Sequence, residues 1–345
     1  MNNFIKSDRK EKMISLDIII PVFNEEEVLD SLFDRLKKVF SSENLEFYKI
    51  NSVRYLIIDD GSKDRSAEII WGYIKEGITA TLYRFTRNFG HQNAVSAGLD
   101  ISTSDVVAVI DADLQDPPEV ILQMIEKWRD GFNVVYGERR KRKENFFKRS
   151  AYWFFYRLLS YLTEIDIPLD SGDFSLMDRK VVKAMCDLPE KIRYPRVIRA
   201  WVGFLQTGVP YERDARIAGQ SKYSFSNYYK LATDGVASAS VRPLRLSQVL
   251  SLTYLLILMV LIVFIAIKYI KYIGIVSGER TLSDEMALWF LFCFTLISFG
   301  GFVQAFLFYI LSAYVGRGYI ETKGRPAYVI METISRDNLT FDSKN

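Results

Sequence analysis

Histidine and cysteine are scarce in this sequence of 345 residues. It contains a single histidine, His91, and two cysteines, Cys186 and Cys293. Zinc sites made of several histidines, four-cysteine clusters and a disulfide framework are therefore excluded. A metal ion bound by this chain must take most of its ligands from oxygen atoms.

Charge is missing from two long stretches near the C-terminus. Residues 246–267 and 286–316, which are 22 and 31 residues long, contain no charged side chain. A helix needs about 20 apolar residues to cross a hydrocarbon core of about 30 Å, so each stretch can span a membrane. Buried core helices are the alternative, although their apolar runs are usually only about 10 to 14 residues long. We predict a two-helix transmembrane domain over residues 246–316.

The flanking segments indicate how these spans are oriented. Residues 1–15 form a polar N-terminal tail that lacks the apolar core of a signal peptide. The connection between the spans, residues 277–285, is acidic. Basic residues flank the outer ends, namely Arg242, Arg245, Arg317, Lys323 and Arg325. This positive-inside pattern predicts a two-span protein of the inner or plasma membrane, with the large N-terminal part and the C-terminal tail, residues 317–345, in the cytoplasm.

Strands and helices alternate in the part before the membrane segment. Short runs rich in β-branched residues predict strands at 16–23, 53–59, 78–85, 106–111 and 133–137. Amphipathic patterns with polar starts predict helices at 25–40, 64–75, 91–101 and 117–130. This order predicts an α/β fold with a mostly parallel sheet and helices on both faces. Ligands of such sheets bind beyond the carboxyl ends of the strands.

Three of the predicted strands end in polar motifs. These are PVFNEEE (21–27), DDGS (59–62) and DADLQDPP (111–118). Asp111 and Asp113 are two residues apart, so a turn there can direct both carboxylates into one crevice, with Gln115 as a third oxygen donor. Such a set leaves coordination positions open and suits Mg2+ or Mn2+ on a diphosphate. The alternative is that aspartate and proline only end the strand and cap the helix that begins near Pro117.

The motifs resemble those of a known enzyme family. IIIPVFNEEE, IIDDGSKDRS, FTRNFGHQNAVSAGL, VIDADLQDPPE, YGERRKR and RIAGQSKYS are similar to segments of the family 2 glycosyltransferases. The chain more narrowly resembles the polyisoprenyl-phosphate glycosyltransferases, which include bactoprenol glucosyltransferases and dolichyl-phosphate mannose synthases. The motifs cover about residues 16–225, and the bacterial bactoprenol members also carry two C-terminal membrane helices.

The resemblance implies a GT-A type catalytic domain over residues 16–225, an inverting transfer, and roles for individual residues. The nucleoside pocket would consist of Pro21, Phe23, Glu25 and Asp60. The donor would contact Asp111 and Ala112, and the metal would be bound by Asp113 and Gln115. Cations for phosphate groups would be Arg139, Arg216 and Lys222. Taken singly, these residues have simpler interpretations: Pro21 can end a strand, Glu25 can cap a helix and Arg139 can belong to a solvated basic run.

The chemistry of a lipid phosphate acceptor suits a chain with one histidine. Transfer to a hydroxyl requires a general base, whereas a phosphate monoester, with a second pKa near 6, is already an anionic nucleophile. The catalytic residues implied by the resemblance are Asp111, Asp113 and Asp173, the last beside the acceptor phosphate. Asp173 can alternatively form a turn around Gly172. His91 begins a predicted helix near the donor crevice, where it can contact a ligand or serve as a cap.

A basic and aromatic segment follows the fifth predicted strand. Residues 139–149 carry seven basic side chains against Glu144, a net charge of +6. Aromatic residues and leucines follow at helical spacing, which predicts an interfacial helix over 139–165 on an anionic membrane surface rather than a nucleic-acid patch. A juxtamembrane helix is expected over residues 226–245. Packing between protomers of a homo-oligomer is the competing explanation for both segments.

We therefore expect a metal-dependent, inverting enzyme that moves one hexose from a UDP-sugar to polyprenyl (undecaprenyl) phosphate. Glucose is the sugar that the resemblance favours, with mannose, N-acetylgalactosamine and formamido-arabinose as alternatives. A processive polysaccharide synthase is a second hypothesis, although RVIRAW (196–201) differs by one residue in spacing from the QxxRW motif of those enzymes. A non-enzymatic lipid-phosphate-binding scaffold would not need so complete a set of site residues.

Overall fold

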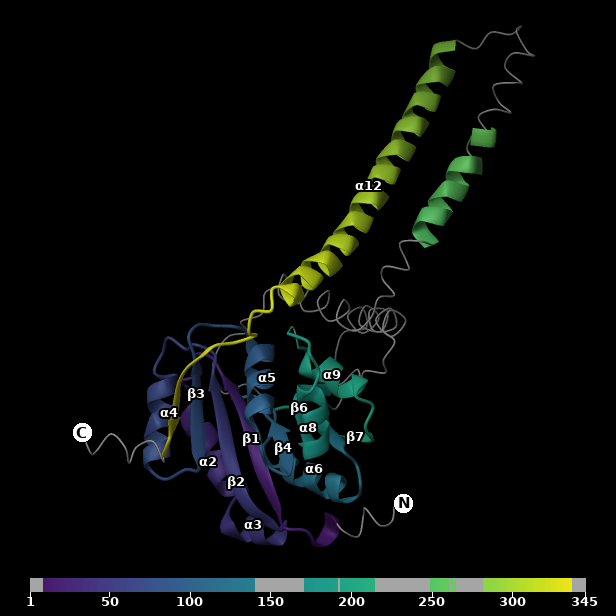
Figure 1. Ribbon diagram of the computed structural model, residues 1–345. Coiled ribbons are helices and arrows are strands. Elements are labelled where there is room, and N and C mark those ends of the chain that lie inside the picture. Colours follow the sequence, from purple (N-terminus) through teal and green to yellow (C-terminus); the bar gives the residue numbers. More distant parts are fainter. Residues whose placement is uncertain are drawn as a thin grey trace. The chain divides into compact units, whose positions relative to one another are not determined.

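A computed structural model describes residues 9–139, 171–191, 193–214, 249–260, 262–264 and 282–336. The chain forms two compact units (Figure 1). The second unit consists mainly of Val236–Lys323, and the first contains most of the preceding residues together with the C-terminal segment Gly324–Asn345. Arg216, Lys222, residues 140–165 of the predicted interfacial helix and the predicted juxtamembrane helix lie outside the described residues.

The first unit contains a sheet with the strand order β7-β5-β6-β4-β1-β2-β3-β8. Its strands are β1 (Ile14–Val22), β2 (Ile50–Asp59), β3 (Ala80–Phe85), β4 (Val106–Val109), β5 (Val134–Arg139), β6 (Ser171–Asp178), β7 (Gln206–Tyr211) and β8 (Ile330–Ser335). Within this sheet β6 and β8 run antiparallel to their neighbours, and the other pairings are parallel. The prediction of an α/β fold with a mostly parallel sheet is confirmed.

Helices cover both faces of the sheet (Figure 1). One face packs against α2 (Leu29–Val39), α4 (Ser66–Lys75) and α6 (Val120–Arg129), and the other against α5 (His91–Ile101), α8 (Arg179–Cys186) and α9 (Pro195–Trp201). The short helix α3 (Ser42–Phe47) precedes β2. In β1, Ile18 and Ile20 belong to the first core and Ile19 to the second, as the alternation of side chains along a strand requires. Burial on both faces explains why this strand is almost continuously apolar.

The sequence did not predict β6, β7 or β8. The segment of β6, SGDFSLMD, contains no β-branched residue, so local propensity gives no strand signal there. Its place in the sheet, between β4 and β5, comes from pairing with both neighbours.

The strand β8 lies within residues 317–345, which the sequence predicts as a tail. It pairs antiparallel with β3 and forms the last strand on that side of the sheet, and Glu332 forms an ion pair with Arg84. Tyr328 stacks on Phe85 with ring centroids 5.2 Å apart and donates a hydrogen bond to Asp100. A segment that follows the second unit in sequence therefore covers one edge of the sheet in the first unit.

The second unit includes α12 (Leu282–Thr322). Its part Phe292–Thr322 is long and apolar enough to cross a membrane, with a mean hydropathy of 1.8. The described residues also include a shorter apolar helical segment within Val249–Phe264. One candidate span is thus found in the part of the chain that the structure describes, and the two-span arrangement stays a prediction.

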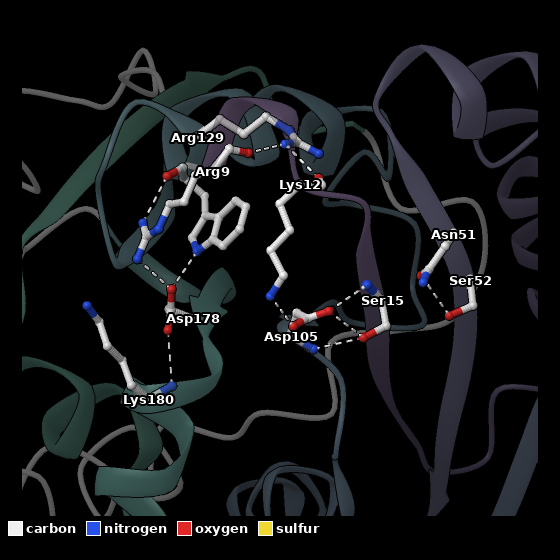
Figure 2. A network of polar contacts seen from close by, with 10 residues as sticks. Arg9, Lys12, Ser15, Asn51, Ser52, Asp105, Arg129, Asp178 and Lys180 are labelled. Carbon is white, nitrogen blue, oxygen red and sulfur yellow. Dashed lines mark hydrogen bonds and ion pairs between the residues drawn. The ribbon is translucent and has the colours of Figure 1, made fainter. Parts of the chain in front are cut away.

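The amino ends of the central strands are closed by a polar network (Figure 2). Asp178 accepts hydrogen bonds from Arg9 Nη2 at 2.6 Å and from Trp128 Nε1 at 2.9 Å. Asp105 accepts from Lys12 Nζ at 2.7 Å and from Ser15 Oγ at 2.9 Å. The network pairs the charged side chains at this edge, and the predicted site residues that the structure describes lie at the opposite edge.

Candidate active site

The loops after β1 and β2 are joined at the carboxyl edge of the sheet. The backbone N–H of Asn24 donates to Ser62 Oγ at 3.0 Å, and the N–H of Lys63 donates to Asn24 Oδ1 at 2.8 Å. The N–H of Glu25 donates to Ser66 Oγ at 2.9 Å. Gly61 has a φ of +73°, and a Cβ there would lie 2.6 Å from the carbonyl carbon of Arg87. These contacts fix the PVFNEEE and DDGS motifs as one surface.

The predicted nucleoside residues differ in exposure. Pro21 is buried at the end of β1, while Phe23 and Glu25 are partly exposed. The N-cap position of α2 is Val28, without a side-chain hydrogen bond, so Glu25 does not act as the cap of that helix. Phe23 and Glu25 lie partly exposed in the loop after β1, beside the loop after β2.

Asp60 holds the loop that leads to α5. Its carboxylate accepts the backbone N–H groups of Phe89 at 2.6 Å and Gly90 at 2.9 Å, and the residue is only 3% exposed. Burial raises the pKa of Asp60, and the two amide hydrogen bonds oppose that shift. In this structure Asp60 therefore orders the backbone before His91; its contact with a nucleoside stays a prediction.

The DADLQ motif forms a tight turn after β4. Leu114 has a φ of +57°, a left-handed conformation that is uncommon for a bulky residue and typical of functional turns. Ala112 and Leu114 are buried in the core, whereas the Asp111 side chain is 32% exposed. Asp113 is 8% exposed, and its Oδ1 accepts the N–H of Gln115 at 3.1 Å. The turn thus separates its apolar residues from its oxygen donors.

Asp173, on β6, lies next to the DADLQ turn although the two are far apart in sequence. Its Oδ2 is 3.3 Å from His91 Nε2 and accepts a hydrogen bond from Gln92 Nε2 at 3.0 Å. Its Oδ1 is 3.6 Å from Arg196 Nε. Burial alone would raise the pKa of Asp173, but Arg196, His91 and Gln92 outweigh it and hold that pKa well below its usual range. Asp173 is part of a strand, so it does not form the turn that was its alternative interpretation.

The electrostatics of Asp111 differ from those of Asp173. Burial raises the pKa of Asp111 to about 6; His91 opposes the rise, and the neighbouring carboxylates Asp116, Asp173 and Asp113 add to it. For His91, burial lowers the pKa, but Asp173 and Asp111 outweigh burial and raise it to about 9. The imidazole is therefore a cation at neutral pH, between two carboxylates.

Asp116 is a site residue that sequence reasoning missed. It is 1% exposed and accepts a hydrogen bond from the hydroxyl of Tyr211 on β7. Arg213 Nε lies 3.5 Å from its Oδ1, and Arg139 Nη2 lies 3.9 Å from its Oδ2. Asp116 stands inside the DADLQDPP motif, yet its basic partners come from distant parts of the sequence. Arg139 thus has a buried carboxylate beside it, which a freely solvated basic run would not have.

Gly172 makes room for the Arg139 guanidinium. A Cβ at Gly172 would lie 2.9 Å from Arg139 Nη2, so any larger residue would displace that side chain. Arg139, Arg196 and Arg213 together place three cations beside the acidic residues. The carboxyl edge of the sheet therefore combines carboxylates with guanidinium groups, which suits ligands that carry both phosphate groups and a cation.

The predicted metal ligands fit a cation that is shared with a ligand. Asp113 and Gln115 offer one carboxylate and one amide oxygen from the same turn. No group of three or more histidine, cysteine or acidic residues suited to a metal occurs among the described residues. A closed protein site is thus not formed there, but Mg2+ is commonly bound through one or two protein oxygens together with substrate phosphates.

The fold is of the GT-A-like α/β class, and the family match makes the chain a glycosyltransferase. The model of the family named Glycosyl transferase family 2 matches residues 17–186. The chain belongs to glycosyl transferase family 2, as the resemblance of its motifs predicts.

Relatives match nearly the whole chain. An uncharacterized glycosyltransferase of Bacillus subtilis (strain 168), YkcC, is 42% identical over 94% of this chain and 96% of its own length. The bactoprenol glucosyl transferase of Shigella phage SfX is 36% identical over 92% of this chain and 99% of its own length. A solved mannosyltransferase of Pyrobaculum calidifontis, in complex with GDP-Man and Mn2+, is 14% identical, with a TM-score of 0.46 over 66% of this chain and 63% of that one. That last likeness is too slight to add to the assignment.

Proposed function

We propose that this enzyme transfers one hexose, glucose, from a UDP-sugar to polyprenyl phosphate, with inversion at the anomeric carbon. Relatives named bactoprenol glucosyl transferase, 35% to 36% identical over 92% of this chain, support the lipid phosphate acceptor and the glucosyl group. The observation that carries the proposal is the mixed charge of the site. Carboxylates lie beside Arg139, Arg196 and Arg213, an arrangement that suits one metal-bound diphosphate and one incoming phosphate.

The reaction needs no deprotonation step. An oxygen of the lipid phosphate, already anionic at neutral pH, attacks the anomeric carbon of the sugar as the bond from that carbon to the diphosphate breaks. UDP leaves with the electron pair, so protons and charges balance without a general base. Asp173 has its carboxylate engaged by His91, Gln92 and Arg196, which supports a role in orienting groups rather than in accepting a proton.

The remaining residues are proposed to bind and orient the donor. Asp113 and Gln115 would hold Mg2+ or Mn2+, which offsets the negative charge of the leaving diphosphate. Phe23, Glu25 and Asp60 with Pro21 would surround the nucleoside. Arg139, together with Arg216 and Lys222 from outside the described residues, would screen the phosphate groups.

The membrane would hold the acceptor next to the site. The apolar part of α12, Phe292–Thr322, supports a membrane location. Two spans in the inner or plasma membrane, a cytoplasmic catalytic domain, an interfacial helix over residues 139–165 and a homo-oligomer complete the proposal. These four features are inferred from the sequence.

Purified full-length protein in detergent, given UDP-[14C]glucose, undecaprenyl phosphate and Mg2+, tests the proposal. We expect one labelled sugar per lipid, and release of UDP only when the lipid is present. Chains of several sugars would instead indicate a processive synthase, and nucleotide binding without transfer would indicate a scaffold. Failure to label the lipid with any common nucleotide sugar would refute the assignment.

A pair of aspartate variants tests the proposed metal ligand. Asp113→Ala should abolish transfer without changing the thermal unfolding midpoint. Asp130→Ala is the matched control, because Asp130 is exposed at the end of α6 and should leave turnover unchanged. Near-normal transfer by Asp113→Ala would remove the metal site from the proposal.

A further inference from the structure

The only histidine of the chain begins α5 at a position that its neighbours fix. The residue before it, Gly90, has a φ of +101°, and its N–H is bound by Asp60. The imidazole side chain is 32% exposed, so one part of it faces the site. Because the backbone that enters α5 is hydrogen-bonded to Asp60, the DDGS loop after β2 helps to set the position of the His91 ring.

Of the two partners of this ring, Asp173 lies on β6, and Asp111 follows the end of the neighbouring strand β4 by two residues. In the β4–β6 ladder, Val106 pairs with Asp178 and Val109 pairs with Ser175. Continuing that antiparallel register by two residues places Asp111 opposite Asp173. Like charges at directly facing positions repel and are destabilising. The fold therefore brings two carboxylates face to face at the edge of the sheet.

His91 lies between these two carboxylates. Its Nε2 is 3.3 Å from Asp173 Oδ2 and 3.7 Å from Asp111 Oδ1. Asp173 has Gln92 and Arg196 as further partners, whereas His91 is the only ion-pair partner of Asp111 among the described residues. The first turn of α5 also favours negative charge near its N-terminus.

We propose that His91 is a positioning residue: its Nε2 is hydrogen-bonded to Asp173, and its ring attracts the Asp111 carboxylate, which fixes Asp111 toward the donor sugar. This inference rests on the proposed function, because it takes Asp111 to contact the donor. Without the imidazole, the two facing carboxylates are no longer bridged, and Asp111 turns away from its partner strand. A displacement of about 1 Å at a reacting group can cost as much as 100-fold in rate.

The variants His91→Ala and His91→Gln separate positioning from folding. We expect His91→Ala to lower kcat at least about tenfold. The dissociation constant for UDP should change less than about twofold, because His91 lies outside the proposed nucleoside pocket. The amide nitrogen of glutamine is as many bonds from Cα as His91 Nε2 is, so His91→Gln should recover most of the rate. A residue with only a structural role would show no such split between rate and binding.

The double variant gives the decisive measurement. Asp173→Asn removes the repulsion that His91 offsets, so adding His91→Ala to Asp173→Asn should lower kcat much less than it does in the wild type. Equal losses of rate in both backgrounds would overturn the inference, as would a His91→Ala enzyme with wild-type kcat. If His91→Ala does not fold, His91→Phe, which keeps a ring of similar size but lacks the N–H groups, with and without Asp173→Asn serves the same comparison. An inactive wild type would refute the proposed function itself, whereas an active wild type with additive variants refutes only the role of His91.

Discussion

Gly98 allows α5 to pack closely against β1, and Gly98→Ala is the perturbation that tests this packing. A Cβ at Gly98 would lie 2.3 Å from Ile19 Cγ2, and 3.0 and 3.1 Å from two further Ile19 atoms. Carbon atoms in contact are normally about 3.5 to 4.0 Å apart, so the closest overlap exceeds about 1 Å. Ile19 is fully buried in the core of that face and has little room to move.

The magnitude follows from two opposing effects. Replacing a glycine inside a helix by alanine stabilises the helix by roughly 0.5 to 1 kcal/mol. Overpacking a well-packed core costs about 1 to 3 kcal/mol. We therefore expect Gly98→Ala to lower the free energy of unfolding by about 1 kcal/mol. The enzyme should also lose rate, because a shift of α5 moves His91, about two helical turns away, from Asp173 and Asp111.

Thermal unfolding of the detergent-solubilised protein and the lipid glucosylation assay provide the readouts. Gly72→Ala is the control: Gly72 lies in α4, and a Cβ added there would have no atom within 4 Å, so that variant should be more stable than the wild type. In an Ile19→Ala background, Gly98→Ala should become stabilising, since the clashing atoms are gone. A higher unfolding midpoint for Gly98→Ala in the wild-type background would refute the packing argument.

Two further predictions concern buried polar and edge contacts. Asp17 is fully buried in β1 and accepts two hydrogen bonds from Arg54. Burial raises the pKa of Asp17, but the hydrogen bonds from Arg54, Thr103 and Ser104 outweigh burial, so the pKa is lowered. Asp17→Asn should lower the free energy of unfolding by about 3 kcal/mol at neutral pH. The difference in stability between this variant and the wild type should shrink below about pH 4, where protonation of Asp17 removes the stabilisation that its charge gives the wild type. A stability difference that does not depend on pH would contradict the prediction. Tyr328→Ala should destabilise the protein by about 2 to 4 kcal/mol, because it removes the stacking on Phe85. Tyr328→Phe, which lacks only the hydrogen bond to Asp100, should destabilise it by about 1 kcal/mol. Equal unfolding midpoints for the two variants would show that stacking does not stabilise the contact of Tyr328 with the sheet.

Much of the catalytic fold could be predicted because its signals are local. Strands β1 to β5 are marked by β-branched apolar runs, and α5 begins at His91 as its pattern predicts. The oxygen donors Asp111, Asp113 and Gln115 directly follow a strand, so their place at the carboxyl edge follows from the direction of a parallel sheet. Periodicity and strand direction are properties of a few consecutive residues, which is why the sequence carries them.

The α/β class, the family and the position of Asp111, Asp113 and Gln115 at the carboxyl edge could thus be predicted from the order of residues alone. The packing of the folded chain determined which distant residues lie beside them. The facing of Asp111 and Asp173 depends on the insertion of β6 beside β4, and the contacts of Asp116 depend on Tyr211 and Arg213. Likewise, β8 follows α12 in the sequence and pairs with β3 in the sheet, although the sequence analysis predicted no strand there. Strand order and register depend on the total free energy of packing segments that lie far apart in the chain. A pattern of a few consecutive residues does not contain that information.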